Sequence, residues 1–159
     1  MSYTNADGLY VKMFKDIGAV IPSGVTAQSP RSAMVIDLTL TSLGTTFGAA
    51  NIIPDLPFIP AGSVIVGATL VMTSAATSSG AATLTIGTYN AAGTAIDADG
   101  IDATVAVAAL GANAVVRCDG AQASGVLGYV TENAYVGSIY ATAAYTAGAG
   151  KLIIEYVKV

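Results

Sequence analysis

The sequence contains no histidine and no tryptophan, and its single cysteine is Cys118. Without histidine, the chain cannot form a Ser-His-Asp or Cys-His catalytic group, and it lacks the most common metal ligand. No Gly-rich loop ending in Gly-Lys-Ser or Gly-Lys-Thr is present, so no P-loop can be identified. A lone cysteine forms no disulfide within one chain, and we interpret Cys118 as a small buried thiol rather than a reactive one. We therefore predict that the protein is not an enzyme.

Charged residues are also scarce, since they make up 10% of the 159 residues and leave a net charge of −4. Lysine and arginine are scattered singly, which excludes the basic patch that binds nucleic acid. Hydrophobic residues make up 53% of the chain. A surface with so few charges suits burial against other subunits. We therefore expect a homo-oligomer that does not bind nucleic acid.

No stretch of the sequence approaches the roughly 20 apolar residues that a membrane-spanning helix needs. The first ten residues, M-S-Y-T-N-A-D-G-L-Y, contain no basic region followed by an apolar core, so no secretory signal is recognisable. We therefore expect the protein to fold in the cytoplasm of a cell and to have no membrane partner.

Alternation of apolar and small polar residues dominates residues 62–89. In the first half, Val64, Val66, Ala68, Leu70 and Met72 fall on one face, and in the second half the residues at 82, 84 and 86 do the same. Such a period of two residues is typical of half-buried strands. The small residues at 74–80 predict a loop between the two strands, either a hairpin or a connection at a sheet edge.

Further strands are predicted at residues 34–40, 104–110, 114–118, 127–130, 135–143 and 151–159. Residues 104–110 could instead form a helical turn, and three prolines make residues 44–62 a long connection. The last two strands are expected to pair through the turn T-A-G-A-G, with the final strand central and covered on both sides. Short strands with long connections predict an all-β antiparallel sandwich, and about eight strands favour a jelly roll.

Residues 1–30 differ in composition from the rest, and we interpret them as an extended N-terminal arm on a sandwich domain of residues 31–159. The alternative is an ordinary first strand of the sheet, and residues 9–21 could be a short helix or an edge strand. The arm combines apolar residues with two lysines, so it could dock on a partner or a neighbouring subunit. The predicted contact residues are Leu9, Tyr10, Lys12, Met13, Phe14 and Lys15.

One acidic segment, I-D-A-D-G-I-D, offers a candidate metal site at Asp97, Asp99 and Asp102. Closely spaced carboxylates can bind Ca²⁺, although the spacing departs from the EF-hand loop. The alternative is a solvated acidic turn. No other cofactor is expected.

Four tyrosines gather near the C-terminus, at Tyr135, Tyr140, Tyr145 and Tyr156. They could form an aromatic platform for carbohydrate, but the absence of tryptophan favours a role in the core or in an interface.

A Pro-Ala-Gly turn enters a Val/Ile-rich strand at residues 60–71, an A-T-L-T-I-G-T strand follows at 82–88, and a T-A-G turn leads into a closing strand at 146–156. These three segments resemble structural proteins of tailed bacteriophage particles, in particular the capsid decoration, or cement, proteins. The resemblance covers about the last 100 residues.

The resemblance implies a jelly-roll sandwich that forms trimers and binds the major capsid protein on the exterior of the virion, without catalysis. The alternative function is a head-fibre or tail-associated module that binds a host receptor or carbohydrate.

Overall fold

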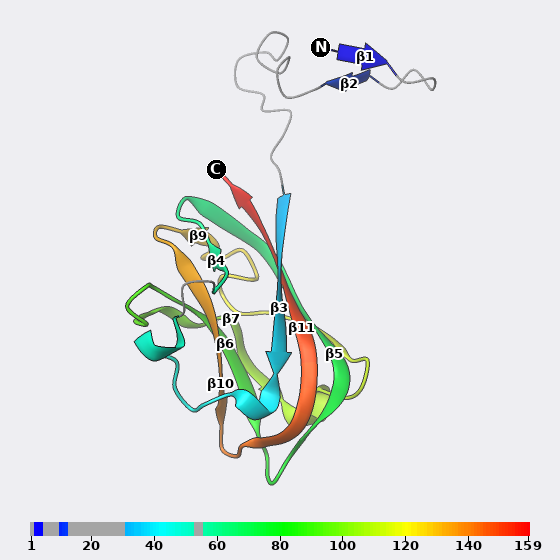
Figure 1. The fold of residues 1–159 in the computed structure, drawn as a ribbon, viewed down its shortest axis with the longest axis vertical. Helices are drawn as coiled ribbons and strands as arrows, with labels where there is room; N and C mark the ends of the chain where they lie inside the picture. Colours follow the sequence, from blue (N-terminus) through cyan, green and yellow to red (C-terminus); the bar gives the residue numbers. More distant parts are fainter. Residues whose placement is uncertain (1, 5–9, 13–30, 53–55) are drawn as a thin grey trace. The chain divides into compact units, whose positions relative to one another are not determined.

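The computed structural model describes residues 2–4, 10–12, 31–52 and 56–159 (Figure 1). The chain divides into two compact units, Met1–Pro30 and Arg31–Val159. In the first unit, β1 (Ser2–Thr4) pairs with β2 (Tyr10–Lys12) in antiparallel orientation. The function of the first unit as an arm stays a prediction.

Two antiparallel sheets build the second unit (Figure 1). The β5 sheet has the order β3 (Arg31–Thr39), β11 (Tyr145–Lys158), β5 (Ser63–Ser78) and β8 (Val115–Arg117), and β9 (Tyr129–Val130) also pairs with β5. The β6 sheet has the order β4 (Phe58–Ile59), β10 (Ala134–Ala141), β6 (Thr83–Tyr89) and β7 (Ala95–Ala106). The all-β sandwich that the sequence predicts is therefore confirmed.

The chain passes back and forth between the sheets rather than completing one before starting the other. After β3 it crosses to β4, returns to β5, and crosses again to β6 and β7; β8 and β9 lie back in the β5 sheet, β10 in the β6 sheet and β11 in the β5 sheet. This connectivity is that of a jelly roll. Across the residues that the structure describes, no helix is long and apolar enough to cross a membrane.

The core lies between the two sheets and consists of aliphatic side chains from both. The largest fully buried residues are Leu40, Ile59, Ile65, Leu70, Met72, Leu84, Ile86, Ile101, Leu110, Val130, Leu152 and Ile154. The alternation predicted for residues 34–40 and 82–86 is confirmed, because Met34, Leu38, Leu84 and Ile86 all face this core.

The predicted alternation along β5 is only partly right. Leu70 and Met72 face the core as expected, but at the start of the strand Ile65 is buried and Val64 and Val66 are only partly covered. A shift in the pairing with β11, at Glu155, causes the change. One extra residue in a strand reverses which side chains face inward from that point.

The connections of β5 and β10 also differ from the expected ones. β5 continues to Ser78, so most of the loop predicted at residues 74–80 is strand, and the chain then crosses to the other sheet. β10 and β11 lie in different sheets and do not pair, and the segment T-A-G-A-G is part of β11. Gly148 has a positive φ of 129°, and a Cβ there would lie 2.8 Å from Leu40, so this glycine continues the strand where another residue would not fit.

The remaining predicted strands differ at their ends, and β7 (Ala95–Ala106) begins well before the strand predicted at residues 104–110. β11 is central, between β3 and β5. β7 ends at Ala106 and a short 3-10 helix, Val107–Ala109, follows, so residues 104–110 combine both predicted conformations. The 3-10 helix Leu40–Ser42 precedes the long connection of residues 44–62, which contains the 3-10 helix Ala49–Asn51 and the two-residue strand β4.

Candidate interaction surface

The outward face of the β5 sheet is unusually apolar for a surface. Two rows of paired residues cross β3, β11, β5 and β8. Their side chains lie on the face of the sheet opposite to the one that contains buried Leu70 and Leu152. These eight residues form what we call the sheet face: Val35, Ile153, Thr69 and Arg117 in one row, and Asp37, Lys151, Val71 and Val115 in the other. Val35 is 53% exposed and Val115 is 67% exposed. An antiparallel sheet that faces water normally carries polar residues there.

Charged side chains surround these apolar residues. Arg31 forms an ion pair with Glu155 at 3.1 Å, and Lys151 forms one with Asp37. Arg117 has no carboxylate partner within the part of the chain that the structure describes. An apolar centre with a charged rim is the typical composition of a protein–protein interface.

A shallow hollow lies across β11, β5 and β8. Its lining includes Arg31, Val66, Gly67, Arg117 and Ile153. A Cβ added to Gly67 would meet nothing within 4 Å, so the absence of a side chain leaves the sheet open at this point. The hollow gives the otherwise flat sheet a place where a partner side chain can be received.

A second apolar surface lies at the loop between β8 and β9. Val126 is 77% exposed, Leu127 is 61% exposed, and Tyr129 is 57% exposed. They line a hollow with Ile96 and Asp97 of β7. We call Ile96, Asp97, Asp99, Val126, Leu127 and Tyr129 the loop patch. Asp99 is included because it is exposed and lies two residues after Asp97 on β7.

Hydrogen bonds hold the loop of this patch against both sheets. The amide of Gln122 donates to the carbonyl of Gly100 at 2.8 Å, and its side-chain oxygen accepts a hydrogen bond from the Thr88 hydroxyl at 2.8 Å. At the other end, the amide of Ile65 donates to the carbonyl of Gly128 at 2.8 Å. The loop therefore presents its apolar residues from a fixed backbone, which lowers the entropy cost of binding.

The predicted metal ligands lie in β7, which is a strand and not the acidic turn of the alternative interpretation. Asp97 and Asp99 lie two residues apart on β7. The pKa of Asp97 is raised, mainly by burial and to a smaller extent by the neighbouring Asp99 carboxyl group. Asp102 is buried and faces Cys118 and Asp119 instead. Within the described ranges, no group of three or more His, Cys, Asp or Glu side chains could hold a metal ion. The Ca²⁺ hypothesis stays a prediction that the placement of Asp102 does not favour.

Cys118 is buried, as the sequence interpretation expects. Burial, and then the neighbouring Asp102 carboxylate, raise the pKa of the thiol to about 12. A thiol with such a pKa stays protonated at neutral pH and is a poor nucleophile. Cys118 therefore belongs to the packing between β7 and β8.

The four C-terminal tyrosines do not form a platform. Tyr135 and Tyr140 lie on β10, whereas Tyr145 and Tyr156 lie on β11 in the other sheet. Tyr145 is buried, Tyr140 and Tyr156 pack against the core, and Tyr135 contacts Phe58 with ring centroids 5.5 Å apart. Their arrangement supports the predicted role in the core.

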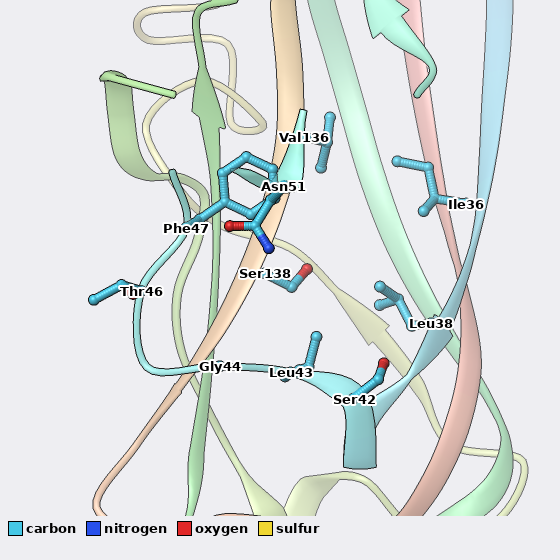
Figure 2. Close-up of a pocket in the computed structure, with 10 residues that line it drawn as sticks. All are labelled: Ile36, Leu38, Ser42, Leu43, Gly44, Thr46, Phe47, Asn51, Val136 and Ser138. Atoms are coloured by element: carbon cyan, nitrogen blue, oxygen red, sulfur yellow. The ribbon is translucent and has the colours of Figure 1, made fainter. Parts of the chain in front are cut away.

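A further hollow, of about 150 Å³, lies between β3, the connection that follows it and β10 (Figure 2). Aliphatic side chains, Phe47, and the polar residues Ser42, Thr46, Asn51 and Ser138 line it, and none of its lining residues is titratable. The Asn51 side chain already accepts a hydrogen bond from the Gly48 amide at 2.9 Å, and Phe47 packs on Tyr89. The lining therefore offers no group for acid–base chemistry.

The structure places few of the predicted contact residues. Tyr10 and Lys12 lie in β2, opposite Thr4 and Ser2. Leu9, Met13, Phe14 and Lys15 lie outside the described residues.

Sequence reasoning missed the sheet face and the loop patch. The available signal was that both faces of residues 33–37 and 151–157 contain apolar residues. The last strand was interpreted as covered on both sides and the strand at residues 34–40 as amphipathic, whereas within the second unit one side of β11 is open.

No family model and no curated protein match the chain. Among solved structures, a chain of the structure titled "Capsid of Ralstonia phage GP4" is similar, with a TM-score of 0.54 and 23% sequence identity. The match covers 91% of this chain and 96% of the other. The two chains therefore share a fold along nearly their whole lengths.

Proposed function

We propose that this protein is a structural component of a tailed bacteriophage particle that binds the exterior of the capsid and stabilises it. In this proposal it acts as a decoration, or cement, protein, contacts the major capsid protein, forms a homotrimer and has no catalytic activity. The observation that carries the proposal is the fold shared with a chain of a phage capsid structure over nine tenths of both chains.

Two features of the second unit support the proposal. Its sheet face exposes Val35 and Val115, which one copy cannot cover, and its hollows contain no arrangement of catalytic groups that we recognise. Exposed contiguous apolar residues indicate contact with another protein. A receptor-binding or carbohydrate-binding module has less support, because the tyrosines are divided between the core and two sheets.

We propose that residues 1–30 supply a major part of the capsid contact. Leu9, Met13 and Phe14 would act as apolar anchors, while Lys12 and Lys15 meet acidic groups on the shell. The segment forms the first compact unit and the sandwich forms the second, so we expect the sandwich to fold without it.

The test is sedimentation of the purified protein with shells assembled without it. The full chain should co-sediment with the shells at a saturable ratio, and a variant lacking residues 1–30 should keep its β-sheet circular dichroism but lose most of the binding. If the truncated protein binds shells as well as the full chain does, the capsid contact lies in the sandwich instead. Absence of binding by the full chain, together with retention on host-surface glycans, would contradict the decoration function and support a receptor-binding one.

A further inference from the structure

The strands of the two sheets in the second unit differ in net charge. All four of its basic residues lie on strands of the β5 sheet: Arg31, Arg117, Lys151 and Lys158. The β6 sheet contains no basic residue, and its strand β7 contains Asp97, Asp99 and Asp102. One surface of each copy is therefore basic and apolar, and another is acidic and apolar.

The basic surface is the sheet face, and one of its cations is available for a partner. Arg31 and Lys151 already pair with Glu155 and Asp37 of the same chain. Arg117 lies beside the hollow at Gly67 and has no carboxylate partner among the described residues. The apolar neighbours of Arg117, at Val71 and Val115, would be covered by any partner that reaches it.

The acidic surface is the loop patch, which has complementary properties. Asp97 and Asp99 lie close together, and the described part of the chain places no cation in an ion pair with either. Exposed Val126 and Leu127 project beside them from a loop fixed by backbone hydrogen bonds. Two neighbouring carboxylates without a cation are the natural partner of an unpaired guanidinium.

We propose that the sheet face of one copy binds the loop patch of a second copy, with Arg117 meeting Asp99 and the two apolar centres in contact. The hollows of the two surfaces share no lining residue, so the contact joins different residues of the two copies. A contact of this kind repeats from copy to copy and closes into a ring when the rotation allows it. The inference rests on the oligomer of the proposed function, and it identifies the two surfaces that would build a trimer.

Charge reversals in the full-length protein test the contact by sedimentation velocity. Arg117→Glu should damage the sheet face and Asp99→Arg the loop patch, so each variant should lose oligomers, with an apparent dissociation constant at least about tenfold higher. The double variant, in which the charges are exchanged, should regain them. Lys158→Glu is the control, because it makes the same charge change outside the sheet face. Circular dichroism and melting curves establish that each variant is folded.

Mixing the two single variants gives the decisive result. Each variant retains the surface that the other has lost, and the two reversed charges also complement each other. An equimolar mixture should therefore form oligomers that neither variant forms alone. A monomeric wild-type protein, unchanged masses for both single variants, or a mixture that stays dissociated would overturn the inference. Shell binding is measured separately, so copies that bind shells as monomers would contradict this contact without contradicting the decoration function.

Discussion

Two buried hydroxyl groups of the sandwich differ in whether they have a hydrogen-bond partner. The Thr88 hydroxyl donates to the side-chain oxygen of Gln122 at 2.8 Å. The Tyr145 hydroxyl is buried and has no partner within the described residues, and burial raises its pKa. A buried polar group without a partner costs about 1–3 kcal/mol. The two residues should therefore respond in opposite ways to removal of the oxygen.

We predict that Tyr145→Phe leaves the protein as stable as the wild type or more stable, because it removes an unpaired hydroxyl and keeps the ring. Thr88→Val should lower the free energy of unfolding by about 1–3 kcal/mol, because Gln122 loses its donor. Urea denaturation of both variants measures the difference. A loss of stability in Tyr145→Phe as large as that in Thr88→Val would show that the tyrosine hydroxyl has a partner.

Asp102 makes the free energy of unfolding depend on pH. The dependence is opposite to that of a salt-bridged carboxylate, whose pKa is lowered in the folded protein. The pKa of Asp102 is raised above its ordinary value in the folded protein, and burial of the carboxyl group is the largest cause. The folded state then binds a proton more readily than the unfolded chain, so this residue favours folding increasingly as the pH falls from neutral to about 4.

We predict that Asp102→Asn raises the melting temperature by a few degrees at pH 7, because an amide has no charge to bury and its oxygen can still accept the hydrogen bond from the Thr104 amide. The advantage over the wild type should shrink toward pH 4. Melting curves from pH 4 to pH 8 measure it, with Glu132→Gln as the control, because Glu132 is exposed and forms no ion pair among the described residues. A difference in melting temperature between Asp102→Asn and the wild type that is constant across this pH range would contradict the raised pKa of Asp102.

At the scale of elements, the sequence predicted where most strands lie but not how they connect. Alternation locates a strand and its buried side, because side chains in a strand point to opposite faces. It contains no information about which sheet a strand joins, so β10 and β11 were paired although they lie in different sheets. Nor does it reveal a shift in register, which is why Val64 and Val66 were placed on the same face as Leu70, although Ile65 is the buried residue at the start of β5.

The close approach of β6 and β7 gives a prediction at this scale. A Cβ at Gly87 would lie 2.2 Å from the carbonyl oxygen of Ala98. Gly87→Ala must therefore push the two strands apart, and we expect it to lower the free energy of unfolding by about 1–3 kcal/mol. Gly67→Ala in β5 is the matched control, because a Cβ there meets nothing within 4 Å and should change the stability by less than about 0.5 kcal/mol. Denaturation of dilute samples compares them, and equal stability of the two variants would contradict the described packing.

At the scale of the whole molecule, composition and patterning predicted the all-β sandwich, and the number of strands favoured the jelly roll that the connectivity has. The interaction surfaces were not predicted. Arg117 and Val35 are far apart in the sequence, and only the register of β3, β11, β5 and β8 brings them onto one face. Low charge indicated that a surface would be covered, but it could not indicate which one.

The central claim is that this sandwich stabilises a capsid from the outside. The most direct measurement is the temperature at which DNA-filled capsids lacking the protein release their DNA, with and without the purified full chain added back. We predict that the release temperature rises with added protein and reaches a plateau when the binding sites are saturated. A release temperature that does not change, under conditions where the protein is folded and in excess, would contradict the claim.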